Sequence, residues 1–318
     1  MNPIRLAFVA AGLALGASAP ALAQAYPVRT VTLVTHSSPG GGSDVFLRHM
    51  IRFLGPKMGV NFVVENVRGG SGAKAVSRVA TAPPDGSVFY ATTPTYIQTA
   101  LLSQVEHDWD SLMPVVNVFL DPEVLFVRSQ SPFGSLAEAM ANAKANPGRQ
   151  KWGAANPASL ERIAMEKLNR LTGARAAIAS HEGGRDMLIN VLNGTLDLGI
   201  GEIQEMRPQI DAGQIRLLAV LGDKRLADVP DLPTAKEQGI DLAVIKFRGL
   251  AGPKGLPENV LRAWDVGIRA VLADPTYRAE YAKESLVPAF MAHEEAGRFT
   301  AAVAADLAHS LRELGVIK

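Results

Sequence analysis

A strand, a glycine-rich loop and the start of a helix follow one another between residues 30 and 54, and this stretch constrains the fold most. Residues 30–35 are mostly β-branched or apolar, which predicts a short buried strand. Pro39 and the three glycines at 40–42 then impose a turn. Apolar residues recur at helical spacing from 45 to 54, so the turn leads into a helix.

The glycine loop and the helix start together predict an anion site. Ser43 or Asp44 is the expected N-cap of the helix. Glycine lets backbone amides approach a ligand closely, and the helix dipole adds about half a positive charge. A strand–helix turn in which glycine serves only geometry is the alternative. The functional interpretation of the whole chain depends on amides behind the glycines that face a gap between two lobes and have no partner in the protein. If the protein itself satisfies these amides, or no gap lies opposite them, that interpretation is expected to fail.

The first 25 residues have the pattern of a secretory signal peptide. A cationic start that includes Arg5 precedes an apolar run at 6–19, which is short for a bilayer span. Small residues follow, so cleavage is expected near Ala23 or Ala25. A membrane anchor is the alternative. We therefore expect an exported, periplasmic protein.

Strands and helices alternate along the rest of the chain in two successive blocks. The first block continues with strands at 61–66 and 88–91, and the second starts after Asp121 and Pro122. Short strand–helix units predict parallel sheets with ligands beyond the carboxyl ends of the strands. Two such lobes predict a ligand cleft between them. Three amphipathic helices are then expected at 257–272, 275–285 and 294–314.

Several classes of function are excluded by what the sequence lacks. It has no cysteine, so disulfides, Cys–zinc sites, iron–sulfur clusters and thiol catalysis are excluded. A formal net charge of +1 gives no indication of a nucleic-acid partner. The glycine loop lacks the lysine of a phosphate-binding P-loop and the third glycine of a dinucleotide fingerprint, and no Gly-x-Ser-x-Gly or His-Glu-x-x-His motif occurs. No cofactor, metal site or catalytic residue is therefore predicted.

His181 and Glu182 form the one adjacent acid–base pair that suggests catalysis. With no nucleophile or metal ligand beside them, contact to a ligand or a structural loop is the preferred interpretation. Hydrogen-bonding groups on loops of two lobes, with Arg248 as a cation, predict a binding site. An exported hydrolase that uses His181 and Glu182 is the enzymatic alternative.

An ordered set of motifs resembles the substrate-binding receptors of tripartite tricarboxylate transporters, also called Bug proteins. Each motif alone is weak, but together they cover essentially the whole mature chain in order. The motifs are Tyr26-Pro27, Val31-Thr32-Leu33-Val34, Pro39-Gly40-Gly41-Gly42-Ser43-Asp44, Val64-Glu65-Asn66, Gly69-Gly70-Ser71-Gly72, Pro84-Asp85-Gly86, Ala145-Asn146-Pro147-Gly148, the run from Asn193 to Leu198, the run from Asp211 to Val220, and Ala273-Asp274-Pro275.

The resemblance implies a type II periplasmic-binding-protein fold, with two α/β domains that close on a small organic acid. It implies delivery of that acid to integral-membrane transporter subunits, and we expect the receptor to act as a monomer. In the family, a ligand carboxylate lies between the first glycine loop and a loop of the second domain. The residues at the matching positions are Ser38, Pro39, Gly40, Gly41, Gly42, Ser43 and Asp44, then Asn156, Ala158 and Ser159, with Thr92, Thr93, Phe247 and Arg248 bordering the cleft.

The second domain departs from the family pattern. His181-Glu182, which precede Gly183, stand where the family often has Tyr-Lys. After the position of Leu198 the family pattern has an acidic residue and then Asn, whereas here Gly201 is followed by Glu202. Hydroxyls and a cation thus give way to carboxylates, partly offset by Arg248. We therefore expect the distal end of the ligand to be a hydroxyl, amine or amide donor and not a second carboxylate.

The resemblance and the two-block pattern also imply the path of the chain. Domain 1 is expected to hold residues 26–120 and 222–318, and domain 2 residues 121–221. A sensor that presents its closed form to a membrane signalling protein shares this fold, and the sequence does not separate it from a transport receptor.

Overall fold

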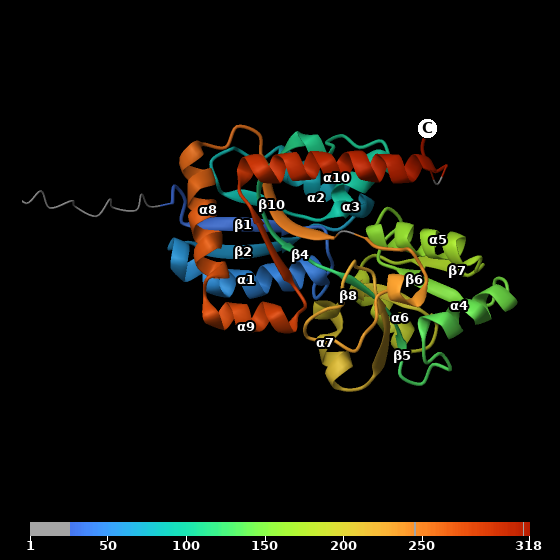
Figure 1. Cartoon of the computed structure of the whole chain (residues 1–318). Helices are drawn as coiled ribbons and strands as arrows, with labels where there is room; N and C mark the ends of the chain where they lie inside the picture. The colour runs from blue at the N-terminus through green and yellow to red at the C-terminus, as the bar shows by residue number, and fades with distance from the viewer. Residues whose placement is uncertain (1–25, 245, 314) are drawn as a thin grey trace, which may run out of the picture.

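The computed structural model describes residues 26–244, 246–313 and 315–318, and the expected signal peptide lies outside them. A six-stranded mixed sheet is the centre of the larger of two lobes, in the order β11-β4-β10-β3-β1-β2 (Figure 1). As predicted, β1 pairs in parallel with β2 and β3, whereas β10 and β11 join in antiparallel fashion. The strands are β1 (Thr30–Thr35), β2 (Asn61–Asn66), β3 (Val88–Thr92), β4 (Leu112–Leu120), β10 (Phe247–Pro253) and β11 (Val287–Met291).

Helices cover both faces of this sheet, because its inner strands are apolar on both sides. Phe89 of β3 packs with α1 and α8, whereas Tyr90 packs with α2 and α3 on the other face. Figure 1 shows α1 and α9 below the sheet and α2, α3 and α10 above it. The helices are α1 (Gly42–Met58), α2 (Ala73–Ala80), α3 (Pro94–Leu102), α8 (Glu258–Leu272), α9 (Pro275–Lys283) and α10 (His293–Glu313).

The small lobe has β5 at its centre, antiparallel to β8 on one side and β9 on the other. A parallel pair, β6 and β7, is joined to this sheet by a bridge between Trp152 and Leu198. The fully buried Trp152 lies in the core of this lobe. The elements are β5 (Glu123–Arg128), β6 (Lys151–Ala154), β7 (Ala177–Ser180), β8 (Gly199–Glu202), β9 (Ile215–Val220), α4 (Leu136–Ala145), α5 (Leu160–Thr172), α6 (Gly184–Leu192) and α7 (Ile203–Asp211).

The chain crosses between the lobes at 121–122 and again between β9 and β10. The expected return near residue 222 is wrong, because residues 222–244 pack on the small lobe. Ala235 N donates to Val220 O at 2.9 Å, Val244 N donates to Leu221 O at 3.0 Å, and Leu242 lies in the small-lobe core. The prolines and glycine between 230 and 239 mark irregular structure in this lobe, not a crossing.

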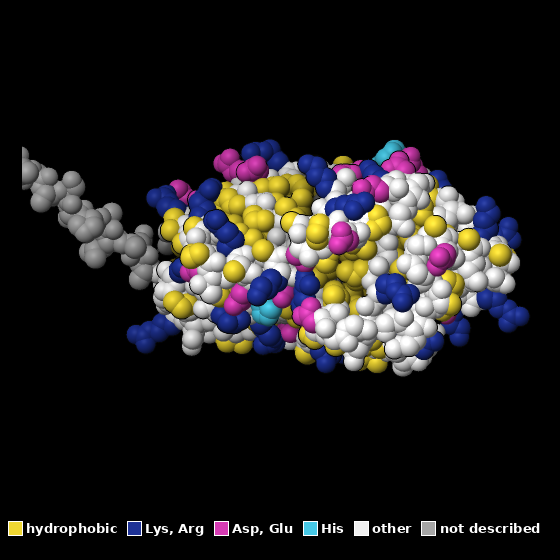
Figure 2. Space-filling model, turned by 60° about the horizontal axis from the view of Figure 1, so that its bottom comes forward, with side chains coloured by type: hydrophobic (Ala, Val, Ile, Leu, Met, Phe, Trp, Pro, Cys, Tyr) yellow, Lys and Arg dark blue, Asp and Glu magenta, His cyan; other side chains and the backbone are white. Residues whose placement is uncertain are grey.

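The two crossings are hydrogen-bonded to each other, since Asp121 N donates to Lys246 O at 3.0 Å. Both signs of charge are interspersed on the face drawn in Figure 2, as the net charge of +1 suggests. Among the helices described, none combines the length and apolar character that a bilayer span requires.

We expect Gly249→Ala to lower the free energy of unfolding by about 2–3 kcal/mol, because overpacking a tight contact strains the structure. A Cβ at Gly249 of β10 would overlap Val116 O and lie 2.9 Å from Thr92 Oγ1, so both neighbouring strands would have to move. Urea unfolding of the purified variant measures this loss.

Gly297→Ala is the matched control, because a Cβ there has nothing within 4 Å and lies inside α10. Alanine at that position should raise stability by about 0.5–1 kcal/mol through helix propensity. Equal effects of the two substitutions would contradict the steric argument.

Candidate ligand-binding cleft

A narrow cavity lies between the two lobes at the carboxyl ends of β1, β3 and β8. It has a volume of about 30 Å³, room for one or two water molecules. It is lined by His36, Ser37, Gly42, Ser43, Thr93 and Thr95 of the large lobe, by Ala155, Asn156, Glu161, Glu182, Gly183, Gly184, Glu202 and Glu205 of the small lobe, and by Lys246 and Arg248.

The α1 helix begins differently from the expectation. Its N-cap is Gly41, without a side-chain cap, so the predicted N-cap at Ser43 or Asp44 is wrong. Asp44 lies in the first turn and accepts hydrogen bonds from Gly40 N at 2.9 Å, Arg48 Nε at 3.0 Å and Asn66 Nδ2 at 3.0 Å. Burial raises the pKa of Asp44, but these hydrogen bonds outweigh it and the pKa is lowered. The carboxylate therefore fixes the loop and does not line the cavity.

The amides of all three loop glycines have partners within the protein, contrary to the expectation. Gly40 N donates to Asp44, and Gly41 N donates to Ser38 O at 2.9 Å. Gly42 N donates to Oε1 of Glu205, which reaches across the cleft from α7 of the small lobe. The donor geometry of an anion site is thus present, but a carboxyl group of the protein occupies it.

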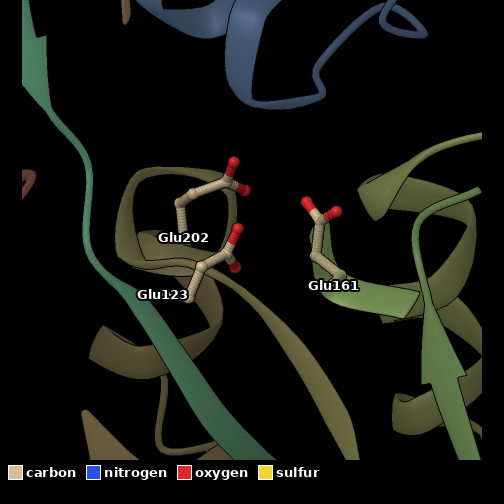
Figure 3. A group of neighbouring side chains, drawn as sticks. All are labelled: Glu123, Glu161 and Glu202. Carbon is tan, nitrogen blue, oxygen red and sulfur yellow. The ribbon is translucent and has the colours of Figure 1, made fainter. Parts of the chain in front are cut away.

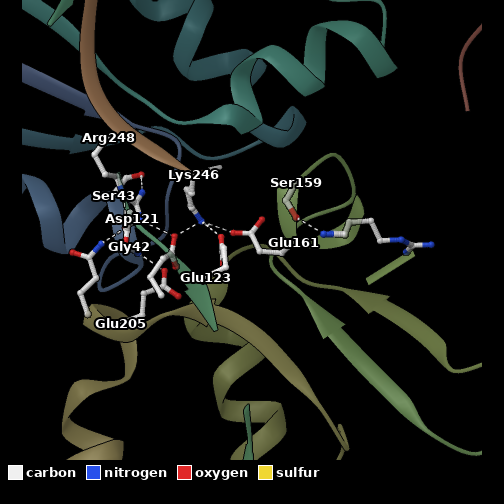
Figure 4. A network of polar contacts seen from close by, with 12 residues as sticks. Gly42, Ser43, Asp121, Glu123, Ser159, Glu161, Glu205, Lys246 and Arg248 are labelled. Atoms are coloured by element: carbon white, nitrogen blue, oxygen red, sulfur yellow. Dashed lines mark hydrogen bonds and ion pairs between the residues drawn. The ribbon is translucent and has the colours of Figure 1, made fainter. Parts of the chain in front are cut away.

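A buried network of charges forms the floor of the cleft (Figure 4). Lys246 Nζ contacts Glu123 Oε1 at 2.8 Å, Glu161 Oε1 at 2.5 Å and Glu202. The Lys246 side chain is 6 % exposed, so water contributes little to its solvation. Three carboxylates therefore satisfy one ammonium group.

Arg248 is the second cation of the network. Its Nε donates to Asp121 Oδ2 at 2.7 Å, Nη1 to Ser43 Oγ at 2.7 Å and Nη2 to Glu202 Oε1 at 2.5 Å. The guanidinium thereby links the first crossing, the start of α1 and the end of β8. It was expected as a cation at the cleft that partly offsets the nearby carboxylates, and it contacts Glu202 and Asp121.

Glu123, Glu161 and Glu202 converge closely enough to hold a metal ion, with one oxygen from each within 4.8 Å of the others (Figure 3). Carboxylate oxygens are ligands that hard divalent cations prefer. Lys246 Nζ already lies among these three groups. The arrangement is therefore that of a cluster built around an ammonium ion.

The network contains more acids than cations, and this excess shifts their pKa values. Burial raises the pKa of Glu123 and Glu205 well above the ordinary range, and the charge of Glu202 adds to both shifts. Burial likewise raises the pKa of Asp121 to about 6. For Glu202, burial is outweighed by Lys246 and Arg248, which lower its pKa to about 2. Glu202 is therefore ionised at neutral pH, whereas burial disfavours the ionised forms of Glu123 and Glu205.

Eight of the predicted site residues line the cavity: Gly42, Ser43, Thr93, Asn156, Glu182, Gly183, Glu202 and Arg248. Two of them have buried polar atoms without a partner in the described part of the chain, namely Thr93 Oγ1 and Asn156 Oδ1. The two residues line the same cavity from opposite lobes. A bound ligand or water can satisfy both.

Other predicted residues of the first loop lie beside the cavity or away from it. Ser38 is buried, its Oγ has no partner among the described residues, and a Cβ at Gly183 would lie 2.7 Å from it. The two lobes thus touch at this point. Pro39 is exposed, and Thr92 lies within the sheet against Gly249 of β10.

The remaining predicted residues have structural contacts. Ser159 caps α5, because its Oγ accepts from Arg162 N at 3.1 Å. Phe247 packs on Phe299 in the core, and Ala158 lines a separate pocket between α5 and the C-terminus. His181 N donates to Ala154 O at 3.1 Å.

Six ionisable residues of the cleft and its charge network were missed by the sequence analysis: His36, Asp121, Glu123, Glu161, Glu205 and Lys246. Asp121 and Glu123 could have been noticed in the sequence, because they interrupt an apolar β-rich run from 115 to 127. Lys246 precedes Arg248 by two residues but follows an irregular stretch. Glu205 had no local signal, because its partner lies on the other lobe.

His36 lies at the end of β1, and its Nδ1 is 2.8 Å from Tyr90 Oη. Burial lowers the pKa of His36 to about 4, and the charges of Lys246 and Arg248 add to the shift. The ring is therefore neutral at neutral pH.

We expect Lys246→Met to destabilise the protein by about 3–5 kcal/mol, because it leaves three buried carboxylates without their cation. Urea unfolding measures the loss. Lys254→Met is the control, since the Lys254 side chain is 62 % exposed and its pair with Asp110 spans 3.5 Å. A control loss within about 0.5 kcal/mol is expected for such a surface site. Equal losses would contradict a central role for Lys246.

We expect His36→Gln to weaken the loss of stability on acidification. The unfolded chain binds this proton near pH 6.5 and the folded chain only near pH 4, so acid favours unfolding between these values. The wild type should lose about 3 kcal/mol more than the variant between pH 7 and pH 4. Urea unfolding across this range tests it, with His309→Gln on α10 as the control for removing a histidine. Parallel profiles of wild type and His36→Gln would contradict the assignment.

The chain is similar in sequence to known proteins along almost its whole length. The chain is similar to a protein from the gbd 5′ region of Cupriavidus necator, at 28% identity over 99% of this chain and 97% of that protein. It is also similar to protein BugT of Bordetella pertussis, at 24% identity over 94% of each.

Solved structures share the fold. The R. palustris protein Rpa4515 with adipate has a TM-score of 0.88 and 26% identity, covering 92% of this chain and 99% of that one. The periplasmic binding protein BugD has a TM-score of 0.84 and 24% identity, covering 92% and 100%. The predicted two-domain α/β receptor fold is thereby confirmed. The sequence model of the family described as tripartite tricarboxylate transporter family receptor matches residues 47–315. The chain therefore belongs to that family.

Proposed function

We propose that this protein is an exported receptor that captures a small organic carboxylate in the cleft between its lobes. It passes the ligand, unchanged, to the membrane subunits of a tripartite tricarboxylate-type transporter. One observation carries the proposal: the N-terminus of α1 already holds a carboxyl group, because Gly42 N donates to Glu205. A ligand carboxylate can take the same donor, and the helix dipole favours its negative charge.

The groups around this donor suit a ligand that touches both lobes. Ser43 and Thr93 line the cavity from the large lobe and Asn156 lines it from the small lobe, and Thr93 Oγ1 and Asn156 Oδ1 have no partner among the described residues. A ligand with contacts on both sides stabilises the closed arrangement by its differential affinity. Hydrogen bonds to a charged group contribute roughly 1.5–3 kcal/mol each. Micromolar affinity requires about 8 kcal/mol, so a handful of such bonds is enough.

The charge of the cleft limits the other end of the ligand. Glu161, Glu202 and Glu205 face the cavity, and the two cations beside them, Lys246 and Arg248, already have partners. A second carboxylate would be repelled, whereas a hydroxyl, amine or amide could donate to these acids. We therefore infer a monocarboxylate with a donor at its distal end.

The family assignment supports the carboxylate class, and the similar Rpa4515 protein was solved with adipate. The adjacent acid–base pair does not favour hydrolysis. His181 is held at Ala154 O, and Glu182 is 73 % exposed and 3.8 Å from Arg68. We expect the protein to act as a monomer in the periplasm, after cleavage near Ala23 or Ala25.

Thermal unfolding of the purified mature protein with a panel of organic acids tests the proposal. Monocarboxylates with a hydroxyl or amino group, such as 4-hydroxybutyrate and 4-aminobutyrate, should raise the melting temperature most. A ligand at 100 times its dissociation constant adds about 2.7 kcal/mol of stability. The matching primary amides, which lack the carboxylate charge, are the control.

Each outcome of this screen has a separate meaning. If no carboxylate in the panel raises the melting temperature more than its amide, the receptor function is wrong. If citrate stabilises far more than the hydroxy and amino monocarboxylates, the receptor function stands but the inferred distal donor is wrong.

A further inference from the structure

The Glu205 side chain makes the one contact in this network that joins α7 of the small lobe to the start of α1. It stands in the first turn of α7, and its Oε1 accepts from Gly42 N (Figure 4). Gly42 is the first residue of α1, so its amide is one of the donors that a helix leaves without an internal partner. The carboxyl group of one lobe thus occupies the anion position of the other.

The carboxyl group fits closely into a space made by glycines of both lobes. A Cβ at Gly42 would lie 3.1 Å from Glu205 Oε1, and one at Gly41 would lie 3.5 Å from it. From the small lobe, a Cβ at Gly201 would lie 3.5 Å from Oε2, and one at Gly184 would overlap the carboxyl group. We call this space, bounded by Gly41, Gly42, Gly184 and Gly201, the carboxyl seat.

The space beside the seat is too small for an organic acid while Glu205 remains in it. The cavity of about 30 Å³ admits one or two waters. Yet Thr93 and Asn156, which are 1 % and 9 % exposed, line this cavity, and their side-chain oxygens Oγ1 and Oδ1 have no partner among the described residues. These two atoms indicate a ligand larger than the present cavity can hold.

We propose that Glu205 is a specificity-determining residue that fills the carboxyl seat in the unliganded protein, and that a ligand carboxylate binds by displacing it. The proposal rests on the proposed function, because it assigns the seat to the ligand of that function. Displacement enlarges the cavity and brings the ligand next to Thr93 and Asn156. A ligand without a carboxylate cannot replace the contact that is lost.

The exchange is favoured by charge. Burial and the charge of Glu202 raise the pKa of Glu205 and so disfavour its ionised form in the seat, whereas the ligand is an anion. An amide donates about twice as strongly to an ionised acceptor as to a neutral one. The helix dipole of α1 adds to this difference. Neutral amides and alcohols gain neither advantage and are rejected.

The test empties the seat and refills it with acetate. Glu205→Ala removes a methylene and a carboxyl group, which together form the skeleton of acetate. In chloride buffer the variant should melt below the wild type. Replacing chloride by millimolar acetate at equal ionic strength should raise its melting temperature by several degrees, while the wild type should not respond. Glu205→Ser serves the same test if the alanine variant does not fold.

Two variants control for the removal of charge. Glu205→Gln keeps the shape and an oxygen acceptor for Gly42 N, so the seat stays filled and acetate should have no effect. Asp211→Asn removes an exposed carboxylate from the same helix and should behave like the wild type.

The expected result is an acetate response confined to Glu205→Ala and Glu205→Ser. The proposal would be overturned if acetate changed the melting temperature of no variant, or if it changed that of all four variants and the wild type equally. The result is independent of the organic-acid screen of the wild type. If an organic acid stabilises the wild type but acetate does not stabilise Glu205→Ala or Glu205→Ser, only the proposed role of Glu205 is wrong. If acetate stabilises these variants but no organic acid stabilises the wild type, only the receptor function is wrong.

Discussion

The ion network around Glu202 is the interaction on which the arrangement of the two lobes depends. Lys246 and Arg248 belong to the second crossing and the start of β10, and both contact Glu202 at the end of β8. Asp121 and Glu123 flank the first crossing and bind the same two cations. Every strand that enters or leaves the small lobe through the crossings therefore ends in this network. Burying so many charges is costly, and each remains tolerable only while its partners stay in place.

The contacts around the cleft are of two kinds: those that can persist when the lobes open, and those that opening must break. Asp121 N is bonded to Lys246 O, so the two crossings form one hydrogen-bonded unit at which the lobes can hinge. The contact of Gly42 in α1 of the large lobe with Glu205 in α7 of the small lobe lies across the cleft instead. Opening must break the second kind and can retain the first. The buried acids near the hinge thus fix where the lobes rotate, and the polar groups across the cleft determine how readily they close.

Local patterns predicted the fold well, and contacts between distant residues account for what was missed. Residues 30–35, 61–66 and 88–91 predicted three strands, and the structure pairs them in parallel as expected. The antiparallel entry of β10 and β11 depends on residues that return after the whole small lobe, so no local pattern indicates it. Residues 222–244 were assigned to the wrong lobe because Pro230 and Pro233 were interpreted as a crossing. The N-cap at Gly41 was missed because Asp44 accepts from Gly40, Arg48 and Asn66 instead.

The contact of Glu205 shows that the condition of unpaired amides behind the glycines is not met, although the anion-site interpretation still stands. The amide of Gly42 was expected to be free, and it is paired, but its partner has the chemistry of the expected ligand. A neutral acid at the N-terminus of α1 stabilises the closed form less than an ionised carboxylate would. Under the proposed displacement, Glu205 is a weak internal substitute for the ligand, and each ligand must exceed the contact that its departure removes. Small neutral molecules would not exceed it, whereas a carboxylate would. Selectivity in this cleft then follows from competition for one amide as much as from the shape of the space around it.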